Sequence, residues 1–359
     1  MRILTRVLFP LLAPLLAVGL RAGGEDPFEP PPEIQAFARH HTNGRAGVPA
    51  KVGALLRAFF APAEEGGLGI VYDNAYTRTP KEVWRDRKAN CLGLTALYVG
   101  ACKSIGLEVR YGEPLRISRW RRVGTTVRYE RHVVAVVQGG TPGQELVADF
   151  LPEVRRDSLL ISPLEPKRVQ ALYFSNRAVE MLAEEKPEDA LHAAQHSIEV
   201  DPGLGVGWNI LGVVQRAEGH EAEAEASFRK ALAVDPKDGA PCGNLENLLR
   251  AQGRTAEAQT YRERGLEIRK RDPFFNAFLA EEALAEQQWE EAGRRIKQAI
   301  KLLPLEPEFY WIQARVALGQ GRTKDAIKAL EKARKWAQPE AQARYDSKLT
   351  LLRNIPPSP

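Results

Sequence analysis

Residues 205–238 read GVGWNILGVVQRAEGHEAEAEASFRKALAVDPKD, and this stretch decides the fold of the C-terminal half. The tripeptide Val-Asp-Pro occurs at Val200–Pro202 and again at Val234–Pro236, one 34-residue period later. A self-similar unit of this length is typical of stacked helix pairs. Small residues fall where two helices would approach each other, and large apolar ones where they would fill the space to the next pair: Trp208, Leu211, Gly212, Ala224, Phe228, Ala231 and Pro236. The stretch therefore predicts one helix–turn–helix unit of a solenoid.

This pattern resembles the tetratricopeptide repeat, and it recurs on both sides of the central unit with fewer matching residues. The upstream unit keeps Phe174, Ala178, Ala190 and Pro202, and the later units keep Ala258, then Ala292, Ala299 and Pro304, then Ala326 and Ala333. We expect about five helix pairs over residues 164–353, closed by a capping helix at Glu340–Arg353, and a disordered tail over residues 354–359. An all-α solenoid of this kind is expected to recruit a protein or peptide partner.

The N-terminus predicts export. Arg2 and Arg6 precede an apolar run, Val7–Leu20, which contains two prolines and is followed by small residues. A short positive region followed by an apolar segment is typical of a secretory signal, here over residues 1–22, whereas the run is short for a membrane span. We therefore expect a periplasmic location. The alternative is that the segment stays uncleaved and tethers the protein to the membrane, or that the protein associates with it peripherally.

The distribution of charge argues against nucleic acid as a partner. The formal net charge of the chain is +5, but residues 164–359 hold 29 basic and 30 acidic side chains. Nucleic-acid binding domains concentrate positive charge on one face, and no part of this sequence does so to that degree. The hydrophobic content of 44% and the charged content of 27% are those of ordinary globular domains.

Residues 23–163 are expected to form an α+β domain behind a proline-rich lead-in. Asn90 is a good N-cap for a helix from Cys91 to about Ile105, and Gly106 stands where such a helix commonly ends. Strand-like segments follow it at Leu107–Tyr111, Val123–Tyr129, His132–Gln138 and Glu145–Phe150. One buried helix followed by strands of this kind predicts a helix packed on an antiparallel sheet.

Three residues of this domain could act together as nucleophile, base and orienting group. Cys91 opens its predicted helix, where the helix dipole and free backbone N–H groups favour a thiolate. His132 opens one predicted strand and Asp149 lies near the end of the next, so adjacent strands could place the two side by side. A cysteine nucleophile needs an imidazole to accept its proton and a carboxylate to orient that imidazole. From spacing alone, the alternative is a buried structural cysteine.

The amino-acid sequence around these residues resembles that of bacterial transglutaminase-like proteins, a superfamily with a papain-like cysteine fold. The resemblance rests on the stretches at Tyr76–Thr79, Arg87–Thr95, Ile105–Leu107, Arg131–Val134 and Val147–Phe150. It implies Cys91 as nucleophile, His132 as general base and Asp149 as orienter. It also implies attack on a peptide or amide carbonyl to give an acyl-thioester, which water would hydrolyse or an amine would accept.

Two further residues are auxiliary candidates for contact with an oxyanion: Trp84, through its indole N–H, and Asn90. The simpler interpretation of Trp84 is an anchor that packs a short helix on the core. We expect no cofactor and no metal, because His192 and His196 share a helical spacing but lack a third ligand nearby. The sequence leaves a second function class open, a non-catalytic scaffold whose first domain only binds.

Overall fold

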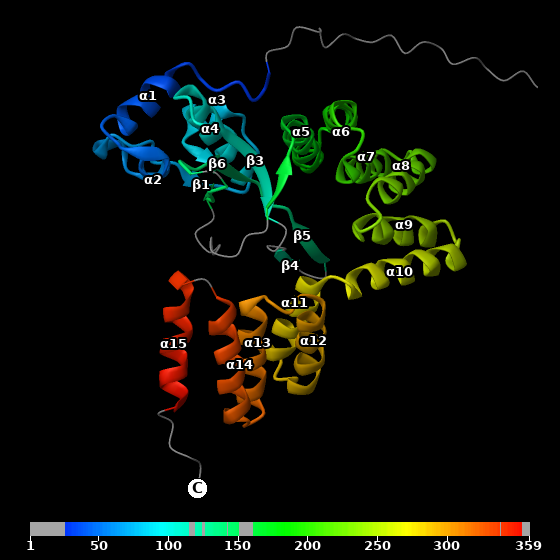
Figure 1. Cartoon of the computed structure of the whole chain (residues 1–359). Coiled ribbons are helices and arrows are strands. Elements are labelled where there is room, and N and C mark those ends of the chain that lie inside the picture. Colours follow the sequence, from blue (N-terminus) through cyan, green and yellow to red (C-terminus); the bar gives the residue numbers. More distant parts are fainter. Residues whose placement is uncertain are drawn as a thin grey trace, which may run out of the picture.

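The computed structural model describes residues 26–114, 119–123, 126–141, 143–150, 161–337 and 339–353. An α+β domain leads into a row of helices, α5–α10, which continues into a second stack, α11–α15 (Figure 1). The expected signal or tether at residues 1–22 and the expected tail at residues 354–359 lie outside the described residues. Within the described part of the chain, no helix is long and apolar enough to cross a membrane.

The first domain is organised around a buried helix, α4 (Cys91–Ser104), whose residues from Leu92 to Cys102 are all buried. The surrounding helices are α1 (Glu33–Thr42), α2 (Gly47–Phe60) and α3 (Pro80–Asp86), with a short 3-10 turn at Ala63–Glu65. A helix that is apolar on every face must be covered on every side. Helices α1 and α3 and the strands β3 and β6 all contact α4. The expected range of this helix, Cys91–Ile105, differs from the observed one by a single residue.

The sheet beneath α4 has four antiparallel strands in the order β7-β6-β3-β8. Their bounds are Val109–Pro114 for β3, Val134–Gln138 for β6, Glu145–Ala148 for β7 and Ile161–Leu164 for β8. Strands β6 and β7 pair with Ala135 opposite Ala148, so the residues just before β6 and just after β7 lie at the same edge. This register positions the candidate site.

The remaining strands differ from the sequence prediction. Instead of one strand at Val123–Tyr129, β4 (Arg119–Val123) and β5 (Thr126–Glu130) form a separate antiparallel hairpin. Two-residue strands β1 (Val71–Tyr72) and β2 (Lys88–Ala89) pair in parallel just before α4. The sequence prediction missed β8, which forms an edge of the sheet beside β3. Short strands of this kind carry too few residues to show a periodic pattern.

The C-terminal part is a helical solenoid of the tetratricopeptide type. Its helices alternate in antiparallel pairs and end in α15: α5 (Pro166–Ala183), α6 (Pro187–Val200), α7 (Gly205–Ala217), α8 (Glu221–Val234), α9 (Ala240–Ala251), α10 (Thr255–Lys270), α11 (Pro273–Ala285), α12 (Trp289–Leu302), α13 (Pro307–Gly319), α14 (Thr323–Trp336) and α15 (Pro339–Arg353). The central pair, α7 and α8, is held by the small and large residues that the sequence pattern singled out. A Cβ added at Gly212 would lie 2.6 Å from the fully buried ring of Phe228.

The solenoid and the first domain share one hydrophobic core. Val169 and Leu172 of α5 and Leu204, the N-cap of α7, are buried in the same cluster as Leu94 and Leu97 of α4. Two more contacts join the parts: Arg131 lies 3.4 Å from Asp235, and α11 contacts strand β4. In Figure 1 the β4–β5 hairpin extends from the first domain toward α11. The boundary near residue 164 therefore separates two architectures within one packed unit.

The turn inside each helix pair places one residue in the left-handed region, and these residues recur with the 34-residue period. Three of them are glycines, Gly219, Gly253 and Gly321, whereas Glu185 and Gln287 adopt φ values of 60° and 58° at the equivalent positions. A residue with a Cβ is strained in this region by about 1 kcal/mol.

Replacing Gln287 by glycine is therefore expected to stabilise the protein by about 0.5–1 kcal/mol, since relief of strain exceeds the entropic cost of an added glycine. Urea unfolding monitored by circular dichroism would measure the change. The reverse substitution at an equivalent turn, Gly219→Ala, should destabilise the protein by a similar amount. A Gln287→Gly variant less stable than the wild type would contradict the argument.

Candidate cysteine–histidine–aspartate site

Cys91 is the first residue of α4, and its position is fixed by the residue before it. The Oδ1 atom of Asn90 accepts a hydrogen bond from the Gly93 N–H at 3.1 Å, which makes Asn90 the N-cap of α4. Gly93 is required by close approach, because a Cβ there would lie 2.5 Å from the Arg78 carbonyl oxygen. Cys91 itself is a free thiol and is only half-buried, while Cys102 and Cys242 are buried. The one accessible thiol of the three thus stands at a helix N-terminus.

The structure brings His132 and Asp149 together at the sheet edge set by the β6–β7 register. The His132 Nε2 atom lies 2.7 Å from Asp149 Oδ1, and both residues are buried, at 3% and 2% exposure. Nε2 is engaged by the carboxylate, so Nδ1 is the ring nitrogen that remains to exchange a proton with a thiol. Among the described residues, Nδ1 has no hydrogen-bond partner. A ring held in this way has a fixed orientation and tautomer.

The electrostatics of His132 link it to Cys91 as well as to Asp149. Burial alone would lower the pKa of the imidazole, because it disfavours the charged ring. The hydrogen bond with the Asp149 carboxylate, together with the attraction of the Asp149 and Cys91 side chains for positive charge, outweighs burial and raises the pKa to about 9. At neutral pH the ring is therefore protonated, with the Asp149 carboxylate bonded to Nε2 and the Cys91 side chain close enough to act on its charge.

The two auxiliary candidates occupy different positions. Both ends of the Asn90 amide make hydrogen bonds: Oδ1 caps the helix and Nδ2 donates to Thr77 Oγ1 at 2.8 Å. The Trp84 ring packs edge-to-face on Phe37, with centroids 5.6 Å apart, and the Arg87 guanidinium lies 4.6 Å from its centre. These contacts favour the interpretation of Trp84 as an anchor that packs α3 on the core. Asn90 contributes to the site by capping the helix that begins at Cys91.

Sequence reasoning missed a buried polar network that joins the first solenoid helix to this cap. Thr77 is 1% exposed; its Oγ1 accepts hydrogen bonds from Asn90 and, at 3.3 Å, from Asn176 of α5. Its N–H donates to Glu180 of α5 at 2.8 Å, and Glu180 is paired with Arg177 at 2.6 Å. About 100 residues separate these partners in the chain, so no local sequence signal could reveal the network.

Thr95 and Arg131 also hold the site and were missed. The hydroxyl of Thr95, one turn along α4 from Cys91, donates to the Val133 carbonyl at 3.0 Å and so ties α4 to the residue after His132. Arg131, the residue before His132, lies between Glu113 of β3 and Asp235 at the end of α8. The histidine is therefore fixed from the helix, the sheet and the solenoid.

Replacing Thr77 by valine is expected to lower the free energy of unfolding by about 1–3 kcal/mol. Valine has the same shape but cannot accept the hydrogen bond from Asn90, and an unsatisfied buried amide carries a desolvation penalty of that size. Urea unfolding would measure the loss. The matched control is Thr350→Val on the exposed face of α15, which should change stability by less than about 0.5 kcal/mol. Equal effects of the two substitutions would contradict the role given to the network.

No metal centre emerges from the described residues, where no group of three or more His, Cys, Asp or Glu side chains gathers as ligands. His196 instead contacts the Phe174 ring and lies 3.2 Å from Glu199.

Comparison with known proteins identifies part of the chain. Residues 207–238 and 242–274 each match a sequence profile described as a tetratricopeptide repeat. This chain carries tetratricopeptide repeats. Its repeat region is similar to the repeat protein YrrB (20% identity, 51% of this chain and 94% of that one, TM-score 0.26) and to a repeat protein of Thermus thermophilus (17% identity, 52% and 100%, TM-score 0.26). It is also similar to PilF of Pseudomonas aeruginosa (17% identity, 54% and 96%, TM-score 0.28). The comparison with curated proteins gave no match.

Proposed function

We propose that the protein is a tetratricopeptide scaffold that binds a protein or peptide partner through its solenoid. The observation that carries this proposal is the repeat pattern itself, matched at residues 207–238 and 242–274 and extended by the helix pairs from α5 to α14. Stacked helix pairs expose a long continuous surface relative to their size, and such surfaces are what solenoid proteins use to bind partners.

First helices of neighbouring pairs contact one another, and the face that they form is called the inner face here. Side chains bridge neighbouring first helices there: Asn244 of α9 donates to Asn209 of α7 at 2.8 Å, and Arg315 of α13 pairs with Glu281 of α11 at 2.6 Å. Arg315 and Glu281 are about two-fifths exposed, so their charged groups are accessible to a partner. An extended peptide lying along this face would meet polar groups from successive repeats.

Selection of displayed random peptides against the full-length protein tests this proposal. Peptides enriched on the wild type should lose at least tenfold in affinity on an inner-face variant, Glu281→Ala with Arg315→Ala. They should keep their affinity on a control variant at an exposed residue of the second helix α8, Lys230→Ala. Failure to enrich any peptide above an empty-surface selection, or binding that ignores the inner face, would overturn the proposal.

A second candidate function is cysteine-dependent chemistry on an amide bond, and the geometry of one site favours it. The proposal is supported by a buried imidazole bonded to a buried carboxylate and by a half-buried thiol at a helix N-terminus that acts on the charge of that imidazole. The order of the elements, with the cysteine on a helix and the other two residues flanking paired strands, is consistent with the transglutaminase-like arrangement. Alkylation of Cys91 in the wild type and in His132→Ala is the decisive test.

In this proposal the Cys91 sulfur attacks the carbonyl carbon of a peptide or isopeptide bond. The C–N bond breaks, and the proton on His132 Nδ1 passes to the departing amine nitrogen. The acyl-thioester is then released by water or by a second amine, which gives its proton back to His132. The N–H groups of Gly93 and Leu94 are bonded to Asn90, so those of Cys91 and Leu92 are the first-turn donors left for the oxyanion.

A further inference from the structure

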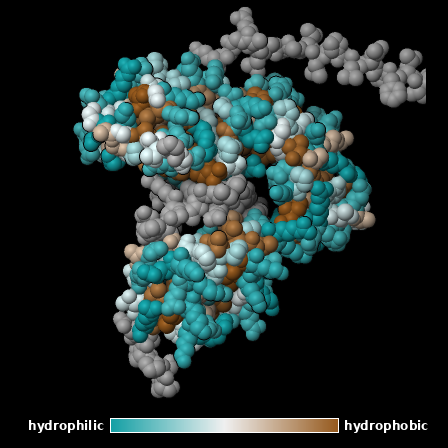
Figure 2. All heavy atoms as spheres, in the orientation of Figure 1, coloured by the Kyte–Doolittle hydropathy of each residue, from teal (hydrophilic) through white to brown (hydrophobic). Residues whose placement is uncertain are grey.

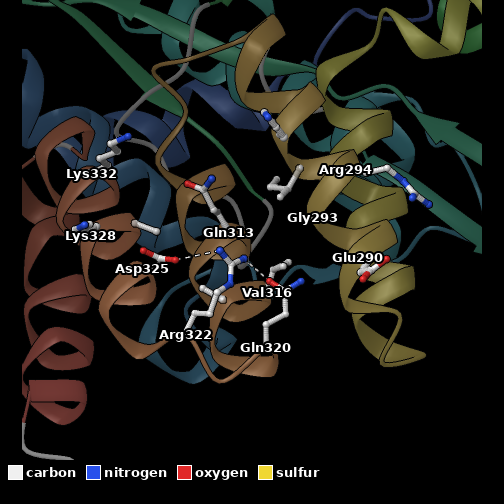
Figure 3. Close-up of a pocket in the computed structure, with 14 residues that line it drawn as sticks. Glu290, Gly293, Arg294, Gln313, Val316, Gln320, Arg322, Asp325, Lys328 and Lys332 are labelled. Atoms are coloured by element: carbon white, nitrogen blue, oxygen red, sulfur yellow. Dashed lines mark hydrogen bonds and ion pairs between the residues drawn. The ribbon is translucent and has the colours of Figure 1, made fainter.

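A groove runs along the outer side of the last two repeats, between the second helices α12 and α14, with α13 as its floor. Its volume is about 640 Å³. Figure 3 shows Lys328 and Lys332 on one wall and Arg294 on the other, with Val316 between them. The floor is apolar and almost fully buried, formed by Ile296, Val316, Ala317 and Ala329. The face of the α11–α15 stack that Figure 2 shows is largely hydrophilic.

Positive charge is concentrated at this groove. Its lining carries five cations, Arg294, Lys297, Arg322, Lys328 and Lys332, against two anions, Glu290 and Asp325. Residues 164–359 as a whole hold nearly equal numbers of basic and acidic side chains, so the excess at the groove is local.

Three of these cations are available to a ligand. Arg322 pairs with Asp325 at 3.0 Å, and Arg294 pairs with Glu291 beside the groove. Lys297, Lys328 and Lys332 are exposed and make no ion pair within the part of the chain that the structure describes. Lys332 only approaches the Tyr310 ring, at 5.7 Å from its centroid. A ligand could therefore reach ammonium groups on both walls without breaking an existing ion pair.

The spacing of the cations fits an extended chain. Lys328 and Lys332 are one helical turn apart, which separates their attachment points by about 6 Å along α14. Alternate side chains of an extended peptide repeat every ~6.8 Å and lie on the same side of the chain. Carboxylates at alternate positions could thus meet successive lysines, while the intervening side chains could face the apolar floor.

We propose that this outer groove binds an extended acidic peptide segment with carboxylates at alternate positions. A hollow between two helices accommodates a single chain, whereas a membrane surface is flat. The lining contains no aromatic side chain on which a nucleic-acid base could stack. The walls of the groove belong to second helices, so this site adds to the proposed partner binding at the inner face and does not depend on it.

Fluorescence anisotropy with the full-length protein and a fluorescein-labelled peptide, Ser-Glu-Ala-Glu-Ala-Glu-Ala-Glu-Ser, tests the inference. Double charge reversal of the groove, Lys328→Glu with Lys332→Glu, is expected to weaken binding at least tenfold. The control reverses the same number of charges outside the groove, Lys230→Glu with Lys237→Glu, and should change binding less than twofold. A peptide with lysine in place of glutamate should not bind.

The following outcomes would overturn the inference. Equal losses in the groove and control variants would mean that the peptide responds to net charge alone. Binding of phosphatidylglycerol vesicles or of a 20-nucleotide single strand that requires Lys328 and Lys332 and exceeds peptide binding would assign the groove to another polyanion. The inner-face variant Glu281→Ala with Arg315→Ala should retain the acidic peptide, so failure of this site and failure of the inner-face proposal are distinguishable.

Discussion

Alkylation of Cys91 by iodoacetamide is expected to stay fast below neutral pH and to slow by at least tenfold when His132 is replaced by alanine. An ordinary thiol titrates near pH 8.5, so only about 0.3% of it is thiolate at pH 6. A protonated His132 beside the sulfur favours the thiolate, and a larger thiolate fraction increases the rate even though such a thiolate is intrinsically less nucleophilic. Peptide mass spectrometry would follow the labelling from pH 5 to pH 10.

Acyl transfer and alkylation should depend differently on pH in the alkaline range. The pKa of His132 lies near 9 because Asp149 and Cys91 outweigh the effect of burial. The imidazolium is therefore present below that pH and is lost as the pH rises through it. Acyl transfer, which needs the imidazolium to protonate the leaving amine, should decline above about pH 9, whereas alkylation, which needs only the thiolate, should not.

The chain contains its own reference thiols for this measurement. Burial raises the pKa of Cys102 to about 12 and also raises the pKa of Cys242, so both should label slowly at every pH below 9. The variant Asp149→Asn keeps the shape of the carboxylate but removes its charge, and should fall between the wild type and His132→Ala. A Cys91 that follows an ordinary thiol profile and ignores His132 would remove the chemical proposal and leave partner binding as the function.

Local patterns in the sequence predicted the parts of the site that depend on local structure. Asn90 followed by an apolar helical pattern fixed the start of α4, and the turn between two strand-like segments implied that His132 and Asp149 meet at one edge. The 34-residue period likewise predicted the solenoid, because each repeat needs small residues where its two helices touch. These features depend on residues close together in the chain, and a single sequence displays them directly.

The contacts that hold the site from outside could not be predicted in this way. Thr77 meets Asn176 and Glu180, and Arg131 meets Asp235, across about 100 intervening residues. Polar residues of these types also occur on ordinary solvated surfaces, so nothing in their local sequence marks them. The predicted division into two domains near residue 164 gave no sign of contacts between them. In the structure the core of the first domain extends through α5 to Leu204.

The shared core leads to a second large effect: Leu204→Ala is expected to destabilise the site helix α4, although Leu204 belongs to the solenoid. Leu204 is fully buried in the cluster that contains Leu94 and Leu97. Removing a buried leucine side chain costs about 3 kcal/mol, from lost burial and the cavity left behind. If α4 opens only together with this cluster, its amide protection in native-state hydrogen exchange should fall about 100-fold, because 1.4 kcal/mol corresponds to a factor of ten.

A matched substitution separates this coupling from a general loss of stability. Leu330 is also fully buried, but its cluster lies in the last repeat, between α13, α14 and α15. In repeat proteins a substitution mainly destabilises its own repeat and the neighbouring ones. Leu330→Ala should therefore lower the amide protection of α13–α15 by a similar factor and leave the amide protection of α4 close to that of the wild type. If Leu204→Ala also spares α4, the first domain and the first repeats open independently. Partner binding to the solenoid could then not affect Cys91 through this core. The expected result would instead mean that the site around Cys91 and the first repeats unfold together as one unit.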